Sequence, residues 1–471
     1  MQSPRRLFVG PSLRRIRRDL GLTQADMAAD LEVSASYIAL LERNHRPLTA
    51  DVLLRLAQTY KIDMAALARS DGSEITARLH GVLKDPMFAD IDLPPLENAD
   101  LAANFPGVTQ ALLRLYTAYQ EEHLALADRG AEALDGDETA PDPVAESRRF
   151  LAARRNSFPV LDDAAERLAQ TVAAEGGLDR HLLARHGLTV RYLPSDVMVG
   201  SVRRLDLHRR QLLLDDAMDA ASRRFQMAQQ IAHLEMQAEL DAALSGAGFV
   251  TESGERLSRR ALASYAAAAI VMPYAAFARA VEARHYDIEA LARQFGTSFE
   301  QTAHRLTTLQ KPGQERIPFF FIRVDPAGNV SKRLDGAGFP FARHGGGCPL
   351  WSVHHAFRTP REIVTQWLEL PDGQRFFSIA RTVTAGGGGF GAARVERAIA
   401  LGCAAEHAER LIYVRARQGA GSGPEAATPI GVTCRLCHRT ECASRSAPPI
   451  GRQILPDDIR KTSAPFGFAN A

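Results

Sequence analysis

The feature that most constrains the fold is a pair of short helix patterns separated by a tight turn within residues 13–48. Thr23 is a strong helix cap, and it precedes a helical pattern over residues 24–31. After a two-residue turn, Ser34 can cap a further helix that ends near Arg43. Two helices joined this closely form a helix-turn-helix, whose second helix is free to enter the major groove of DNA. The sequence therefore predicts a DNA-binding domain.

Charge supports the same interpretation only locally. The chain of 471 residues carries a net charge of +2, so its composition alone does not indicate a nucleic-acid partner. The first 18 residues, however, contain no acid and six arginines, namely Arg5, Arg6, Arg14, Arg15, Arg17 and Arg18. Clustered arginines supply the sequence-independent attraction to phosphates that a DNA-binding domain needs.

Residues 13–48 resemble the Cro/CI-like (XRE) helix-turn-helix family in their Thr-Gln, Val-Ser, Tyr-Ile and Glu-Arg pairs. The resemblance implies that Arg17 pairs with Glu42 to brace the domain. It also implies that Gln24 and Arg43 contact DNA phosphates. The other residues of the expected DNA-binding surface are Arg17, Ser34, Ala35, Ser36, Tyr37 and Leu40. Ala35 and Leu40 cannot donate hydrogen bonds, so they could read only a thymine methyl group or the shape of the groove.

The stretch 223–235, RRFQMAQQIAHLE, resembles the active helix of the ImmA/IrrE-type zinc peptidases. In their His-Glu-x-x-His motif two histidines bind zinc and the glutamate activates water. Here Gln229 and Gln230 replace the first ligand and the general base, and only His233 remains. Aligning on the Met-Pro pair that follows places Arg260 at the third ligand. Amides are poor zinc ligands and arginine repels a cation, so we expect no enzyme and interpret His233 as a core or helix-face histidine rather than a ligand.

A second helix-turn-helix pattern lies at residues 287–306, with Gly296 in its turn and Ser298 as a cap. It resembles the stretch that follows the Met-Pro helix in the same peptidases. Few basic residues flank it, so a helical hairpin packed under the middle domain is favoured over a second DNA-binding element.

From about residue 312 the pattern changes to a mixed α+β domain. Apolar runs predict strands over 317–325, 330–334 and 376–383. Helices are predicted over 357–370 and 392–405. The fold class is therefore mainly α in the first two-thirds and α+β at the C-terminal end. Four domains are predicted. Residues 1–70 form the DNA-binding domain, and 71–150 a helical connector with an acidic linker. Residues 151–310 form the degenerate peptidase-like domain, and 311–471 a sensor domain.

Three of the five cysteines, Cys434, Cys437 and Cys442, fall within nine residues as C-x2-C-x4-C. A C-x2-C pair lets two sulfurs converge on one metal ion, and the third can reach the same centre from the following turn. Cys348 or Cys403 could supply a fourth ligand. Zinc and a [4Fe-4S] cluster both accept four thiolates, so the sequence leaves these two open. Unliganded surface thiols are the third interpretation.

The three parts in this order resemble the short-chain fatty acyl-CoA regulators of bacteria. The resemblance rests on RRFQMAQQIA, MPYAAF, VDPAGNVSKR, GCPLW, LPDG and CRLCHRTEC, which span most of the chain. It implies a transcription factor that binds acyl-CoA made from acetate, propionate or similar acids and controls genes for their assimilation. Cations are needed for the CoA phosphates, and Lys332, Arg333 and Arg343 are the candidates.

A homodimer is expected, because helix-turn-helix proteins usually read two half-sites. One alternative is a redox- or iron-responsive regulator that senses through a cysteine-bound [4Fe-4S] cluster. The other is an active peptidase, which the missing ligands disfavour. The preferred acyl chain, the operator and the direction of regulation stay open.

A cytoplasmic protein is predicted, because no apolar segment follows the N-terminal arginines as in a signal peptide. The longest uncharged run, 261–278, approaches membrane-spanning length but contains Pro273. We therefore expect no membrane partner and interpret this run as a buried helix that ends near Met272.

Overall fold

The computed structural model describes residues 13–14, 17, 22–42, 46, 49–60, 79–83, 101–102, 105, 108–109, 111–113, 115–116, 119, 142–342, 347–386, 394–419, 426–449, 454 and 463–468. The chain forms two compact units, residues 1–124 and 125–471. Most of the predicted helical connector and acidic linker lies outside the described residues.

The first unit contains the predicted helix-turn-helix. Its helices are α2 (Gln24–Asp30), α3 (Ala35–Glu42) and α4 (Ala50–Tyr60). Thr23 caps α2 in a capping box with Asp26, and the Ser34 hydroxyl accepts a hydrogen bond from the backbone N–H of Tyr37. Both predicted caps are confirmed. A small core holds the helices together, formed by Leu13, Met27, Ala28, Leu31, Ile38, Leu41, Val52 and Leu56.

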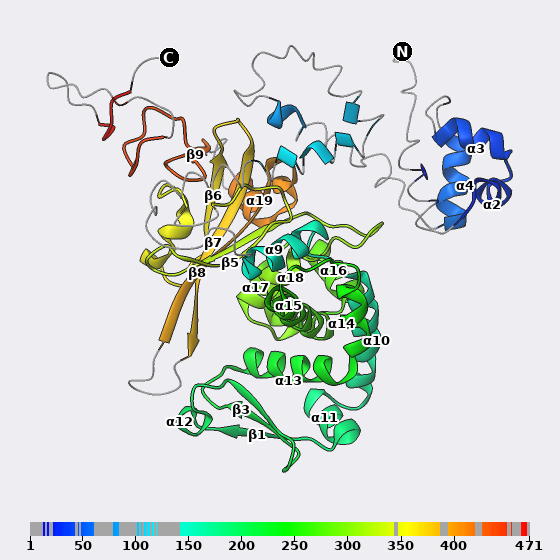
Figure 1. Cartoon of the computed structure of the whole chain (residues 1–471), viewed down its shortest axis with the longest axis vertical. Coiled ribbons are helices and arrows are strands. Elements are labelled where there is room, and N and C mark those ends of the chain that lie inside the picture. The colour runs from blue at the N-terminus through cyan, green and yellow to red at the C-terminus, as the bar shows by residue number, and fades with distance from the viewer. Residues whose placement is uncertain are drawn as a thin grey trace. The chain divides into compact units, whose positions relative to one another are not determined.

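The second unit begins with a helical region around a small sheet. Its helices are α9 (Pro143–Ala153), α10 (Pro159–Ala174), α11 (Leu178–His186), α12 (Ser195–Met198), α13 (Ala220–Glu235), α14 (Gln237–Leu244), α15 (Glu252–Val271), α16 (Tyr274–Ala283), α17 (Ile288–Phe295) and α18 (Phe299–Leu306). The strands β1 (Thr189–Leu193), β2 (Arg203–Asp206) and β3 (Gln211–Asp215) form the sheet in the order β1-β3-β2. Helix α13 lies between this sheet and α15 (Figure 1).

Helix α15 is the centre of the helical region. Its last ten residues contain no charge, and all but one of them are buried within the fold. It ends at Val271 with Met272 as its C-cap, which confirms the predicted end near Met272. Within the described chain no single helix has the length and apolarity to cross a membrane, although α15 and α16, which meet at a bend of 66°, together pass by length and composition.

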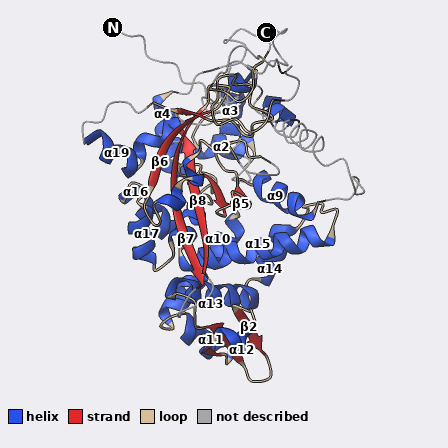
Figure 2. Ribbon diagram, turned by 90° about the vertical axis from the view of Figure 1, so that its left-hand side faces the viewer, coloured by secondary structure: helices blue, strands red, loops and turns tan. Residues whose placement is uncertain are grey.

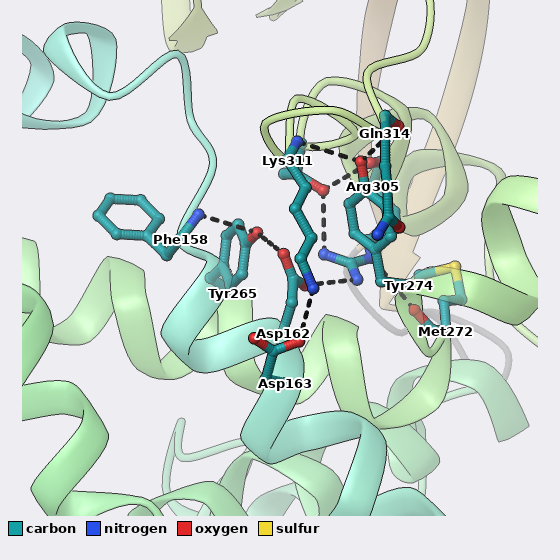
Figure 3. Close-up of polar contacts among 10 residues, drawn as sticks. Phe158, Asp162, Asp163, Tyr265, Met272, Tyr274, Arg305, Lys311 and Gln314 are labelled. Carbon is teal, nitrogen blue, oxygen red and sulfur yellow. Dashed lines mark hydrogen bonds and ion pairs between the residues drawn. The ribbon is translucent and has the colours of Figure 1, made fainter. Parts of the chain in front are cut away.

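The hairpin α17–α18 confirms the second helix-turn-helix pattern as a packed element. Gly296 ends α17 in the left-handed conformation, and Ser298 caps α18. Arg305 of α18 is fully buried and donates to the Asp162 carboxylate of α10 at 2.7 Å. The Tyr265 hydroxyl donates to the other oxygen of the same carboxylate at 2.6 Å (Figure 3). Because α18 is anchored in the core through Arg305, it is not free to enter a DNA groove.

The C-terminal part is built on a six-stranded sheet in the order β5-β4-β8-β7-β6-β9. The elements are β4 (Phe320–Val324), β5 (Val330–Leu334), η2 (Ser352–His354), η3 (Ala356–Arg358), β6 (Val364–Glu369), β7 (Arg375–Gly386), β8 (Arg394–Ala404), η4 (Ala405–Arg410), α19 (Ile412–Gly419) and β9 (Thr428–Pro429). Ile379, Leu401 and other sheet residues join one core cluster with the helices, and Figure 2 shows the strands beside those helices. This core continues across residue 310, so that domain boundary stays a prediction.

The mixed helical and α+β fold class is confirmed, but two predicted helices are wrong. Residues 394–404 form the central strand β8, which pairs with both β4 and β7. From Ala398 to Cys403 both faces of the strand are buried, so this part shows no polar alternation and its alanines imitate a helix. Gly402 lies so close to the Phe320 ring that an added Cβ would be 2.2 Å from it. Residues 357–370 form a short 3₁₀ turn and then β6.

Candidate functional site

The residues expected to face DNA lie on the exposed side of α3. Ser34, Ala35, Ser36 and Leu40 are exposed, and Tyr37 is half-buried. The hydroxyls of Ser34 and Ser36 lie 3.0 Å apart, so both belong to one polar patch at the start of the helix. Arg43 lies outside the described residues. The domain therefore presents the start of α3 as a surface that can approach a groove.

The brace predicted between Arg17 and Glu42 is present. The guanidinium of Arg17 contacts the buried Glu42 carboxylate at 2.5 Å, and the side-chain amide of Gln24 donates to it at 2.7 Å. Burial raises the pKa of Glu42, but the hydrogen bonds from Arg17 and Gln24 outweigh burial, so its pKa is lowered overall. Gln24, expected on a phosphate, thus also takes part in this internal network.

The position of the peptidase zinc site is electropositive. Gln229 donates to the Ser264 hydroxyl at 3.1 Å instead of binding an ion. Burial and the nearby Arg203 lower the pKa of His233. Burial and the nearby Arg260 in turn lower the pKa of Arg203. Arg203 therefore lies beside the remaining histidine, with Arg260 near Arg203, and a metal cation is disfavoured there. Arg203 comes from β2, and no motif around it in the sequence points to this role.

A cavity of about 370 Å³ lies between α10, α11, α13 and α15. It is lined by Ala169, Val172, Ala173, Gly177, Leu178, Asp179, Arg224, Met227, Ile270 and Val271. Most of these side chains are apolar, and the volume lies within the range of small-molecule sites. Arg224 is fixed at the wall because it donates to the carbonyls of Phe295 and Gly296 at 2.8 and 3.0 Å.

The basic residues predicted for CoA phosphates lie on the edge strand β5. Lys332 and Arg333 are consecutive, so their side chains leave opposite faces of the strand. Burial is the main cause that lowers the pKa of Lys332 to about 8. The neighbouring Arg323 lowers this pKa further, whereas Glu300 raises it. Arg333 donates to the carbonyl of Ala342. The two cations do not form one phosphate cradle, and Arg343 lies outside the described residues.

Cys348 lies beside the C-terminal cysteine loop. Its thiol accepts a hydrogen bond from the backbone of Gly431 and is close enough to Cys434 and Cys437 for them to raise its pKa, although burial is the larger cause. A Cβ on Gly431 would lie 2.8 Å from the sulfur of Cys437. Cys442 follows in the same loop. In the described part of the chain, however, no three cysteine sulfurs all lie within 4.8 Å of one another.

Cys403 is corrected as a candidate ligand. It is fully buried in β8, opposite Phe377 of β7, in the core cluster shared with the helices. Cys348 packs in a different cluster with Ala398 and Ala400, which alternate with Cys403 along β8. Cys403 and Cys348 thus lie on opposite faces of the sheet, and burial raises the pKa of Cys403 far above its ordinary value.

Arg445, one of the basic residues that flank the cysteines in the sequence, organises the cysteine loop. Its buried guanidinium donates to the carbonyls of Cys434 at 2.8 Å, Cys437 at 2.7 Å and Ala447 at 3.1 Å, and also to that of Arg439. The backbone N–H of Ser446 donates to the Cys434 sulfur at 3.4 Å. One arginine therefore holds the backbone of the loop from inside.

An exposed recognition helix on a braced domain, joined to a peptidase-like frame without its catalytic residues, defines a DNA-binding transcriptional regulator. Comparisons with known families agree. Residues 13–67 match a helix-turn-helix family, 183–307 the IrrE N-terminal-like domain, and 308–466 the C-terminal domain of the short-chain fatty acyl coenzyme A regulators.

The most similar relatives include a propionyl-CoA carboxylase regulator from Cereibacter sphaeroides, 39% identical over 98% of each chain. The transcriptional regulators RamB and PrpR of Mycobacterium tuberculosis are 36% and 35% identical, over 98% of this chain and 98% and 96% of theirs. A solved Mycobacterium tuberculosis transcriptional regulator matches 69% of this chain and 99% of its own, with a TM-score of 0.63 and 36% identity. The chain belongs to the short-chain fatty acyl-CoA regulator family. Its named relatives are regulators, in line with the expectation that it is not an enzyme.

Proposed function

We propose that the protein binds operator DNA as a homodimer and that a short-chain acyl-CoA changes its affinity for that DNA. The exposed face of α3 carries the DNA half of this proposal, with Ser36 and Leu40 at base edges and a second protomer on the other half-site. The relative named for propionyl-CoA carboxylase directs the effector half towards propionyl-CoA.

The cavity next to Arg224 is the site that we propose for the acyl chain. Val172, Leu178 and Met227 supply an apolar surface, and the cavity has room for a short acyl thioester. The fixed guanidinium of Arg224 provides a cation at its wall. Lys332, Arg333 and Arg343 stay candidates for the phosphates of the same ligand.

A gel-shift assay on the promoter of the protein's own gene tests the function. Affinity for the promoter is expected to change when propionyl-CoA is added, and to fall steeply with salt because phosphate contacts release counterions. The effector half fails if a panel of acyl-CoAs leaves the affinity unchanged, while DNA binding itself remains a separate result.

Filling the cavity is expected to abolish the response without harming DNA binding. Ala173 lines the cavity and is exposed, so Ala173→Trp places an indole in it without disturbing the core. We expect acyl-CoA affinity to fall about tenfold to a hundredfold, which corresponds to a loss of about 1.4–2.7 kcal/mol of binding free energy. Isothermal titration with propionyl-CoA measures this. The matched control, Ala174→Trp, adds the same ring at an exposed position outside the cavity, and equal losses in both variants would contradict the assignment.

We also propose a thiolate metal centre formed by Cys348, Cys434, Cys437 and Cys442. The donor set suits either zinc or a [4Fe-4S] cluster, and the Arg445 contacts support a loop of fixed backbone around them. An optical spectrum and metal analysis of freshly purified protein separate the two. A brown protein whose DNA affinity changes on oxidation supports the redox-sensing alternative, and a colourless protein with zinc at this loop rejects it.

A further inference from the structure

Two histidines and a glutamate converge at the end of α11, on residues that the function above does not use. His181 and His186 belong to α11, and Glu235 is the last residue of α13. The Nε2 atoms of His181 and His186 lie 2.6 and 2.7 Å from the same Oε1 atom of Glu235. Their ligand atoms all lie within 4.8 Å of one another.

A second carboxylate orients the buried histidine from behind. The Nδ1 atom of His181 lies 2.6 Å from Oε2 of Glu175, and Arg185 holds the other oxygen of Glu175 at 2.6 Å. A carboxylate on the far nitrogen is the usual outer partner of a metal-binding histidine, because it fixes the proton on Nδ1 and leaves the Nε2 lone pair for the metal.

Hydrogen bonds alone account poorly for this arrangement. His181 has a side chain that is 1% exposed and a carboxylate at each ring nitrogen, so it needs two protons and a buried positive charge to satisfy both. His186 then has to donate a further proton to the Glu235 oxygen that His181 already uses. A divalent cation replaces both Nε2 protons and neutralises the carboxylates.

We propose that His181, His186 and Glu235 bind one zinc ion, with Glu175 as the outer partner of His181. Two imidazoles and one carboxylate form a ligand set that zinc accepts, with water as the fourth ligand. The side chain of His186 is 22% exposed, which gives the ion a path from solvent. Ligands at Zn–N distances of about 2.0–2.1 Å in a tetrahedral site lie about 3.3 Å apart, so the Glu235 oxygen, now 2.6 and 2.7 Å from the two nitrogens, needs to move away from each by roughly 0.6–0.7 Å. On binding, the Nε2 proton of His181 passes to solvent, and that of His186 is transferred through water to its own Nδ1, which leaves both Nε2 lone pairs for the metal.

This site is separate from the lost peptidase site on the same helix. Glu235 follows His233 by two residues, which turns it by about 200° around α13. Arg203 lies beside His233, whereas His181 contacts two carboxylates, Glu175 and Glu235. The electrostatics therefore repel a cation on one face of α13 and attract it on the other.

Zinc binding to the chelator-stripped full-length protein tests the proposal, with competition against a colorimetric chelator as the readout. Glu235→Gln and His186→Gln are each expected to bind one zinc per chain fewer than the wild type. Glu175→Gln is expected to keep the stoichiometry and to bind this zinc about 10- to 100-fold more weakly. His208→Gln removes an exposed histidine from the turn between β2 and β3 and is expected to behave as the wild type.

The comparison between variants isolates this site, because the thiols of the C-terminal loop are unchanged in all of them. Circular dichroism and the gel shift confirm that each variant folds. Equal zinc uptake by the wild type, Glu235→Gln and His186→Gln overturns the proposal. So does a Glu175→Gln protein that binds zinc as tightly as the wild type.

Discussion

Asp162→Asn is expected to destabilise the second unit by about 3–5 kcal/mol, the usual result of removing one partner from a buried ion pair. Asp162 and Arg305 are both fully inaccessible to solvent and lie 2.7 Å apart. The amide leaves the guanidinium of Arg305 as an uncompensated charge between α10 and α18, and it also weakens the acceptor of the Tyr265 hydroxyl. Urea unfolding followed by circular dichroism measures the change.

The adjacent residue provides the control. Asp163 pairs with Lys311 at 2.6 Å, but its side chain is 51% exposed, so Asp163→Asn is expected to cost less than about 1 kcal/mol. Both pairs are drawn in Figure 3. If the two variants lose similar stability, burial does not decide the effect and the reasoning is wrong.

Glu42→Gln is expected to unfold the helix-turn-helix domain in part and to abolish operator binding. The carboxylate of Glu42 is fully buried and accepts hydrogen bonds from both Arg17 and Gln24. Neutralising it leaves Arg17 poorly paired, which is expected to reduce the stability of the domain by about 3 kcal/mol. A small domain has little stability to lose. A gel shift together with thermal unfolding measures both effects.

The control is Glu32→Gln, since Glu32 pairs with Arg55 through a side chain that is 81% exposed. Loss of this exposed ion pair is expected to leave the DNA affinity within about twofold of the wild type. A large loss of DNA affinity in Glu32→Gln would contradict the special role of the Arg17–Glu42 pair. The contribution of Glu42 also depends on pH. Because its pKa is lower in the folded chain, the contribution is complete above about pH 4.3 and is lost as the pH falls through the folded pKa.

Local signals made much of the fold predictable. Caps such as Thr23 and Ser298 act within one helical turn, so the helices that they begin could be read from the sequence. The strand β8 was misread because a strand buried on both faces gives no alternation, and its pairing with β4 and β7 overrides the helix preference of its alanines.

The sites were predictable only where their residues are close in the chain. The C-x2-C pair is visible in the sequence, but whether Cys348 or Cys403 accompanies it depends on which face of the sheet each occupies. His181 and Glu235 are 54 residues apart and form no motif, so only the packing of α11 against α13 brings them together.

The helix α11 has one further consequence. Its first residues, Gly177 to Asp179, form part of the cavity wall, and its last residue, His186, reaches Glu235. The nine residues of this helix span about 13 Å and move as one rigid element. An occupant of the cavity and an ion at the proposed zinc site would therefore both contact the same helix. If a ligand in the cavity changes the affinity for the ion by some factor, thermodynamic linkage requires the ion to change the affinity for that ligand by the same factor.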